Sequence, residues 1–228
     1  MSAPGETLEL GGGGQAIFTS RVHGNLSSVG GDGSHEGALA RERLRELIGA
    51  RGLLRGYQAH GTTVRRVSHD PSPDSEVPAE EADGQATNVR GLAAIVLSAD
   101  CLPVALGCDG AVAALHAGWR GLAAGVLEQG VIALRELGAR EGQITAVVGP
   151  GAGPCCYEVG EEVHVAFAGR HRHGQNIDLR AIAHERLLAA GVAEVRDVQA
   201  CTICDERYFS HRREGRRAGR QGVAMWLS

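Results

Sequence analysis

Three residues that can bind a soft metal ion lie where apolar segments of this sequence end. Cys101 lies in the segment 98–104, His116 follows one short strand later, and His60 lies in the segment 58–64. One thiolate and two imidazoles suit Zn²⁺, and three protein ligands leave one position for water or substrate, as in catalytic zinc sites. Taken singly, a core cysteine and two hydrogen-bonded structural histidines explain these residues as well. The residue pattern alone leaves both interpretations open.

The elements that must position these residues are short apolar strands alternating with amphipathic helices. Residues 1–14 end in four glycines and are expected to be a flexible or turn-rich approach to a single domain over 15–228. Hydrophobic periodicity predicts strands over 15–20, 53–58, 64–67, 92–97, 104–106, 111–115, 144–148, 195–198 and 223–227. It predicts helices over 38–48, 121–137 and 179–190, the last capped by Asp178. The pattern indicates an α/β (α+β) domain with central mixed sheets flanked by helices, and with its chemistry in loops at strand ends.

Composition excludes several classes of function. The chain of 228 residues contains no lysine, which excludes Schiff-base chemistry and a Walker-type phosphate loop. A net charge of −4 gives no general attraction to nucleic acid or membranes, although residues 211–220 are locally basic. Without a signal sequence or a membrane-spanning run, we expect a cytoplasmic protein.

The cysteines are expected to be reduced thiols, because the chain is too large to need disulfide staples. Cys201 and Cys204 have the spacing of a redox motif or a zinc knuckle, but a solitary pair is better explained as two buried thiols. The vicinal Cys155 and Cys156 lie in the glycine- and proline-rich segment 149–157, which forbids regular structure. This pair could lie near the metal, but vicinal cysteines rarely both bind one ion.

Several strings in this sequence resemble the signature segments of the laccase-domain family, formerly called polyphenol oxidases. They are Gln58-Ala-His-Gly61, Ala99-Asp-Cys-Leu-Pro-Val104, His116-Ala-Gly-Trp-Arg-Gly121, the segment 149–159, and Phe209-Ser-His-Arg-Arg213 with Gly219-Arg220. The resemblance runs in order through nearly the whole chain, from about Phe18 to Trp226. It implies a mixed α/β fold, a monomer, and a metal held by His60, Cys101 and His116.

The same resemblance implies zinc-dependent phosphorolysis of purine nucleosides together with adenosine deaminase activity. A half-open zinc site lowers the pKa of bound water to roughly 7, which suits deamination if a carboxylate transfers protons. Asp100 and Asp83 are the candidate carboxylates, with Asp100 placed alongside Cys101 and His116 among the catalytic residues. As the strand neighbour of Cys101, Asp100 should point to the opposite face, where it would be a supporting group instead.

Phosphorolysis requires groups that bind phosphate and the purine. The planar guanidinium of arginine suits phosphate, so Arg120 is the first candidate and Arg21, Arg212 and Arg213 follow. Gln58 and Trp119 complete the predicted substrate-binding residues, with Tyr157 as another aromatic that could stack on a purine. The segment Arg21-Val-His-Gly-Asn-Leu-Ser27 departs from the family pattern Arg-x-Gly-Gly-Val-Ser. This departure affects the loop expected to meet the substrate.

Two other functions remain open. Cys101 could be the nucleophile of a hydrolase or a peptidoglycan-precursor editing enzyme, with His116 as its base. A non-catalytic binding protein or a copper-dependent polyphenol oxidase is the other alternative. A multicopper site needs many more His-x-His pairs than His171-Arg-His173, so zinc is the expected metal.

Overall fold

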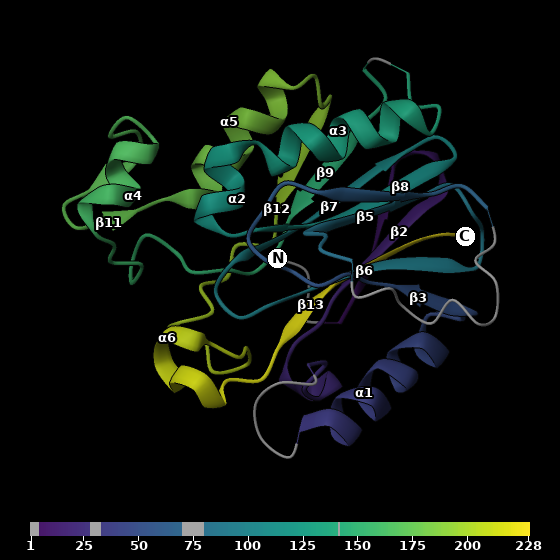
Figure 1. Ribbon diagram of the computed structural model, residues 1–228, viewed down its shortest axis with the longest axis horizontal. Helices are drawn as coiled ribbons and strands as arrows, with labels where there is room; N and C mark the ends of the chain where they lie inside the picture. The colour runs from purple at the N-terminus through teal and green to yellow at the C-terminus, as the bar shows by residue number, and fades with distance from the viewer. Residues whose placement is uncertain (1–4, 28–32, 70–79, 141) are drawn as a thin grey trace.

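Two β-sheets packed face to face form the centre of the computed structural model, which describes residues 5–27, 33–69, 80–140 and 142–228 (Figure 1). The five-stranded sheet has the order β1 (Thr7–Leu10), β2 (Gly14–Phe18), β13 (Gln221–Leu227), β6 (Leu92–Ser98) and β3 (Gly52–Leu54). The six-stranded sheet has the order β12 (Glu194–Asp197), β9 (Thr145–Val148), β7 (Leu102–Cys108), β8 (Ala111–Ala117), β5 (Gly84–Thr87) and β4 (Val64–Val67). Both sheets are mixed, so the predicted fold class is confirmed.

Alternating side chains divide the core into three layers. On β7, Val104 and Leu106 face the helices while Ala105 faces the other sheet. On β2, Phe18 faces the other sheet while Ile17 packs on the outer side. This period of two lets central strands such as β7 and β8 bury both of their faces, whereas the outer strands β1 and β12 stay partly exposed.

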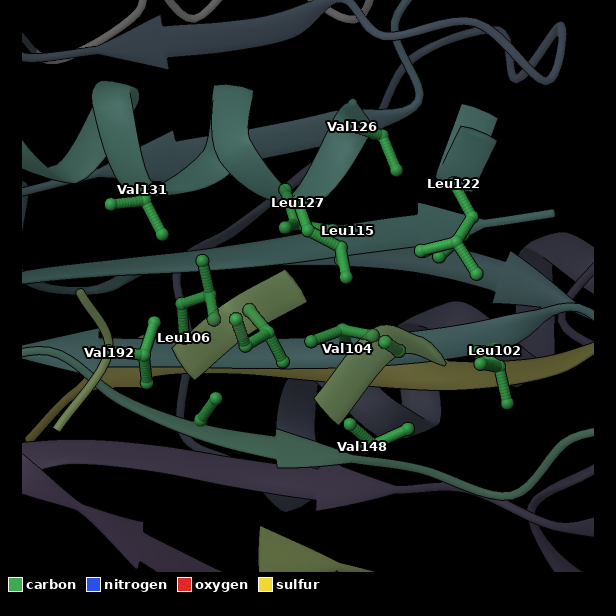
Figure 2. Packing of buried hydrophobic residues seen from close by; sticks show 14 of the residues in the cluster. Leu102, Val104, Leu106, Leu115, Leu122, Val126, Leu127, Val131, Val148 and Val192 are labelled. Atoms are coloured by element: carbon green, nitrogen blue, oxygen red, sulfur yellow. The ribbon is translucent and has the colours of Figure 1, made fainter. Parts of the chain in front are cut away.

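Helices cover the two outer faces of the pair of sheets. The helices α2 (Trp119–Ala124), α3 (Val126–Glu136) and α5 (Leu179–Ala189) lie over the six-stranded sheet, and α1 (Gly33–Leu47) lies over the five-stranded sheet (Figure 1). Figure 2 shows Val126, Leu127 and Val131 of α3 above Val104 and Leu106 of β7. Asp178 caps α5 as predicted, accepting hydrogen bonds from the backbone amides of residues 180 and 181. None of the described helices combines the length and apolar character that crossing a membrane requires.

Sequence patterns misplaced some elements. The predicted helix over 121–137 is two helices, because Gly125 adopts a left-handed conformation with φ of 106° and ends α2. Residues 7–10, expected to be flexible or turn-rich, form β1, because their backbone pairs with β2, an interaction that composition does not reveal. Strand β5 was missed since Gly84–Thr87 is short and polar although fully buried.

Further short elements complete the chain and were also not predicted. They are η1 (Gly11–Gly13), η2 (Arg21–His23), α4 (Glu161–Ala166), β10 (Arg172–His173), β11 (Asn176–Ile177), α6 (His211–Glu214) and η3 (Gly215–Arg217). Three prolines and several acidic residues predict an exposed loop over 70–82, and most of that segment lies outside the described residues.

Candidate metal centre and active site

Strand directions bring the predicted ligands to one edge of the six-stranded sheet. Strands β4, β5 and β7 begin at this edge and the antiparallel β8 ends there. His60 precedes β4, Asp83 directly precedes β5, and Cys101 directly precedes β7. His116 lies one residue before the end of β8, opposite Pro103. Residues separated by up to 56 positions therefore meet because their strands share an edge.

The three predicted ligands converge. The Cys101 sulfur, one ring nitrogen of His60 and one of His116 all lie within 4.8 Å of one another. The distance from Cys101 Sγ to His60 Nε2 is 3.7 Å, and the two histidine rings meet edge to face at 4.9 Å. His116 is 4 % exposed whereas His60 is open to solvent, so the group has one buried and one accessible side. The donor set and this half-open placement fit a catalytic metal ion.

Asp83 holds both histidines in place and is fully buried. Its Oδ1 lies 2.7 Å from His116 Nδ1 and accepts the backbone amide of His60 at 3.0 Å. Its Oδ2 accepts the amides of Ala59 at 3.1 Å and Gly61 at 2.7 Å. With Nδ1 engaged, His116 presents Nε2 to the metal position. Asp83 is thus a positioning residue with no free oxygen for proton transfer.

Close packing also restricts the loop that carries His60. His60 has a φ of 62°, which is uncommon for a residue other than glycine. Gly118, opposite Cys101, has no room for a side chain, because a Cβ there would lie 2.5 Å from His60 Cδ2 and 3.2 Å from Cys101 Sγ. Glycine is therefore required at position 118 of the string His-Ala-Gly-Trp, because any side chain there would collide with His60 and Cys101.

Charge interactions favour an ionised Cys101–His116 pair when no metal is bound. Burial would raise the pKa of Cys101, but His116 and His60 beside it lower that pKa to about 6. Burial likewise opposes charge on His116, yet Cys101 and Asp83 raise its pKa to about 9. At neutral pH a thiolate then faces an imidazolium.

Arginines and aromatic rings adjoin this centre. The guanidinium of Arg120 lies over the Trp119 ring at 4.3 Å, and that of Arg212 lies over the Tyr157 ring at 5.1 Å. Burial raises the pKa of Tyr157 to about 12, with the Cys101 thiolate adding to the effect, so its hydroxyl stays protonated. Burial lowers the pKa of Arg220, while the nearby charges of Cys101 and Asp100 act in the opposite direction.

Arg220 is a candidate that residue types alone did not single out, although Gly219-Arg220 belongs to the matching strings. Its backbone amide donates to Asn25 Oδ1 at 2.8 Å, and the same oxygen accepts the amide of Ser27 at 3.0 Å. Asn25 is one of the residues at which this chain departs from the family pattern. The altered loop therefore holds the backbone of Arg220, whose charge interacts with that of Cys101.

Two predicted site residues hold backbone in place instead of facing an open space. The side-chain amide of Gln58 donates to the Leu97 carbonyl oxygen at 2.6 Å and accepts from the Leu97 amide at 2.8 Å. These two hydrogen bonds connect the His60 loop to β6. Asp100 accepts the Thr202 hydroxyl and the Arg212 amide, both at 2.7 Å. These two contacts make Asp100 a supporting group for the segments that carry Thr202 and Arg212.

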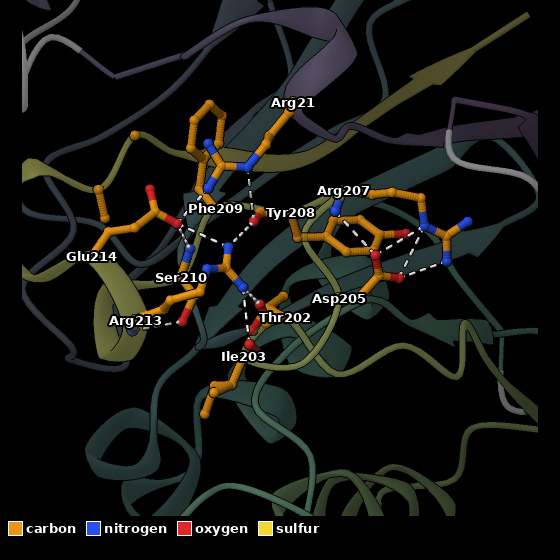
Figure 3. A network of polar contacts seen from close by, with 12 residues as sticks. Arg21, Thr202, Ile203, Asp205, Arg207, Tyr208, Phe209, Ser210, Arg213 and Glu214 are labelled. Atoms are coloured by element: carbon orange, nitrogen blue, oxygen red, sulfur yellow. Dashed lines mark hydrogen bonds and ion pairs between the residues drawn. The ribbon is translucent and has the colours of Figure 1, made fainter.

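Arg21 and Arg213 are engaged in a polar network around α6 (Figure 3). Arg213 donates to the carbonyl oxygens of Thr202 at 2.8 Å and Ile203 at 2.9 Å, and pairs with Glu214 at 2.8 Å. Arg21 pairs with the same Glu214 and lies over the Phe209 ring at 4.4 Å. These contacts hold together the segment that carries Arg212.

Comparisons with known proteins agree with the site motifs. Residues 6–228 match the family model described as multi-copper polyphenol oxidoreductase laccase. The chain is 40 % identical over 221 residues to a Xylella fastidiosa (strain Temecula1) protein named purine nucleoside phosphorylase, covering 90 % of this chain and 84 % of that protein. It is 36 % identical to a Corynebacterium glutamicum protein also named purine nucleoside phosphorylase, covering 92 % and 93 %.

A solved structure supports the same assignment. The crystal structure of Neisseria meningitidis protein NMB0706, of family DUF152, superposes with a TM-score of 0.84 at 27 % identity, covering 99 % of this chain and 100 % of that one. The chain therefore belongs to the laccase-like polyphenol oxidoreductase family, several of whose members are named purine nucleoside phosphorylases.

Proposed function

We propose that this protein is a zinc-dependent purine nucleoside phosphorylase, with adenosine deamination as a second reaction at the same centre. The observation that carries the proposal is the convergence of His60, Cys101 and His116 within 4.8 Å beside the arginines of the site. The names of relatives that align over 84 % and 93 % of their own length support the choice of substrate.

His60, Cys101 and His116 would hold the zinc ion, since one sulfur and two imidazole donors are typical of it. When bound, zinc would act as a Lewis acid and would make water a better nucleophile at neutral pH. Copper fits the proposal less well than zinc. His171 Nε2 lies 2.9 Å from Glu185, and among the described residues neither His171 nor His173 groups with His60, Cys101 and His116.

Phosphorolysis breaks the bond between ribose C1′ and the purine nitrogen while a phosphate oxygen forms a bond to C1′. Arg120, Arg212 and Arg220 supply positive charge to bind the phosphate and to hold its oxygen toward the sugar. Trp119 and Tyr157 hold the guanidinium groups of Arg120 and Arg212 over their rings, and in this proposal the purine would lie alongside these stacked pairs. The departing purine leaves with the bonding electron pair and takes up a proton.

Deamination would replace the 6-amino group of adenosine by an oxygen from water and release ammonia. Asp83 and Asp100, the carboxylates considered for proton transfer, are both engaged in hydrogen bonds. They therefore position His116 and Arg212 in this proposal. The Tyr157 hydroxyl, which its raised pKa keeps protonated, would serve in this proposal as a hydrogen-bond donor to the substrate.

A direct assay tests the proposal. Purified protein is incubated with inosine or adenosine, with and without phosphate, and products are separated by chromatography. Free base and ribose 1-phosphate that appear only with phosphate support phosphorolysis, whereas inosine formed from adenosine without phosphate supports deamination. Absence of both reactions in protein loaded with zinc would refute the proposal.

A cysteine-dependent hydrolase is the second candidate, and the ionised Cys101–His116 pair backed by Asp83 favours it. His60→Ala separates the two functions, because it removes one metal ligand while leaving Cys101, His116 and Asp83 in place. A zinc-dependent enzyme should lose metal and activity, whereas a cysteine hydrolase should keep its activity. His173→Ala, at an exposed histidine on β10, is the matched control.

A further inference from the structure

Four cysteines from two distant segments meet at the edge of the sheet that also carries the candidate active site. The sulfur atoms of Cys155, Cys156, Cys201 and Cys204 all lie within 4.8 Å of one another. Cys204 Sγ is 2.8 Å from Cys156 Sγ and 3.4 Å from Cys155 Sγ. Cys155 and Cys204 are exposed, so the expectation that Cys201 and Cys204 are simply two buried thiols is wrong.

Strand order explains the meeting. Strand β9 runs antiparallel to β7 and parallel to β12, so β9 and β12 both end at the edge where β7 begins. The segment after β9 contains Cys155 and Cys156, and the segment after β12 contains Cys201 and Cys204. Gly151 joins the two segments by accepting the Thr202 amide at 3.0 Å and donating to the Ala200 carbonyl at 3.3 Å.

Backbone amides around the four cysteines are directed at a sulfur atom, as in loops that supply cysteine ligands to a metal ion. The Gly153 amide donates to Cys201 Sγ at 3.2 Å, and the amides of Ile203 and Cys204 also point to this sulfur. Gly153 permits the approach, because a Cβ there would lie 3.1 Å from Cys201 Cβ and 3.4 Å from Cys155 Sγ. Amides directed at a sulfur stabilise a thiolate, the form of cysteine that binds metal.

The spacing of the sulfurs matches a single tetrahedral ion. With zinc–sulfur bonds of about 2.3 Å, a tetrahedron has sulfur–sulfur edges of roughly 3.8 Å. The observed upper limit of 4.8 Å allows all four sulfurs to reach one ion with small side-chain movements. An iron–sulfur cubane carries its thiolates around four irons and needs a wider arrangement.

We propose that Cys155, Cys156, Cys201 and Cys204 bind a structural Zn²⁺, separate from the ion held by His60, Cys101 and His116. Four thiolates close the coordination sphere, so this ion would stabilise the fold and leave no position for substrate. It would clamp the segment after β9 to the segment after β12.

Both cysteine segments also contact residues of the candidate active site. Thr202, between two of the cysteines, donates its hydroxyl to Asp100 at 2.7 Å, and Asp100 is the neighbour of Cys101. On the other segment, Tyr157 directly follows the vicinal cysteines and lies against Arg212. Loss of the structural ion should therefore loosen two walls of the site while leaving the three catalytic ligands present.

Metal analysis and X-ray absorption of the full-length Cys101→Ala variant, purified with reductant and without chelators, test the proposal. The variant should retain about one zinc per chain, with four sulfur neighbours at about 2.3 Å. No retained zinc, iron in its place, or a shell containing nitrogen would overturn the proposal. Because this variant lacks a ligand of the catalytic centre, failure of the proposed function does not affect the result.

Substitution within the cluster gives a second test. Cys204→Ser should lower the zinc content of the otherwise unchanged protein from about two ions per chain to about one, and should make unfolding begin at a lower temperature. Cys108→Ala removes an isolated buried thiol and should leave the zinc content unchanged. An unchanged zinc content in Cys204→Ser would contradict the site, as would mass spectrometry that finds these four cysteines joined as disulfides.

Discussion

Replacing Asp83 by asparagine tests whether one buried carboxylate organises the catalytic metal centre. The substitution keeps the size of the side chain but turns one of two acceptor oxygens into an amide donor. Each oxygen accepts from two donors: His116 Nδ1 and the His60 amide on one, the Ala59 and Gly61 amides on the other. Whichever way the asparagine is oriented, two donors lose their acceptor.

The expected effects can be worked out from these contacts. A fully buried donor left unsatisfied costs about 1–3 kcal/mol, so two lost donors lower the unfolding free energy by at most about 6 kcal/mol, and by less where the part-buried amides of the His60 loop can reach water. Loss of a group that orients a metal-binding histidine typically lowers metal affinity 10- to 100-fold. Both effects should appear together, because the same carboxylate holds the His60 loop and orients His116.

Zinc affinity is measured by competition with a chromophoric chelator, and stability by urea unfolding of the zinc-free protein. Asp109→Asn, at the exposed turn between β7 and β8, is the matched control and should change neither quantity. Asp83→Asn with zinc affinity within twofold of the unsubstituted protein would refute the role assigned to Asp83. Normal stability together with weakened zinc binding would show that Asp83 orients His116 but does not stabilise the His60 loop.

Three other measurements probe the same centre. Gly118→Ala should lower zinc affinity and the rate of phosphorolysis at least tenfold, since the new Cβ would lie 2.5 Å from His60. Gly160→Ala, at another helix start, is the matched control, because its Cβ would meet only the flexible Glu162 side chain. Zinc affinity should rise roughly tenfold per pH unit between pH 6 and 9, because His116, with its pKa raised to about 9, must lose a proton before it binds zinc, whereas Cys101, with its pKa lowered to about 6, is already ionised. Calorimetry in several buffers should find that zinc binding releases about one proton at pH 7. A value near zero would contradict the ionised pair. Arg220→Gln should raise the KM for phosphate roughly 10- to 100-fold, as expected for loss of a charge-assisted hydrogen bond, and an unchanged KM would remove Arg220 from the phosphate site.

Local patterns predicted most of the elements because each depends on nearby residues. The apolar runs at 92–97 and 111–115 became β6 and β8, and Asp178 caps α5 through amides two and three residues away. Elements that depend on distant partners were missed. Strand β1 has its partner in β2, and the polar β5 is buried because β8 and β4 flank it in the sheet while β6 and α3 pack against it.

Motifs that are short strings, matched residue by residue, are enough to assign the family and the three candidate ligands. The way in which these ligands are held follows from the fold, because Asp83 contacts His60 and His116 from 23 and 33 residues away. The fold also brings Cys155 and Cys156 to Cys201 and Cys204, which the spacing within each pair does not indicate. Hydrogen bonds between strands link segments that are far apart in the chain, and they therefore set which loops lie at the same edge of the sheet.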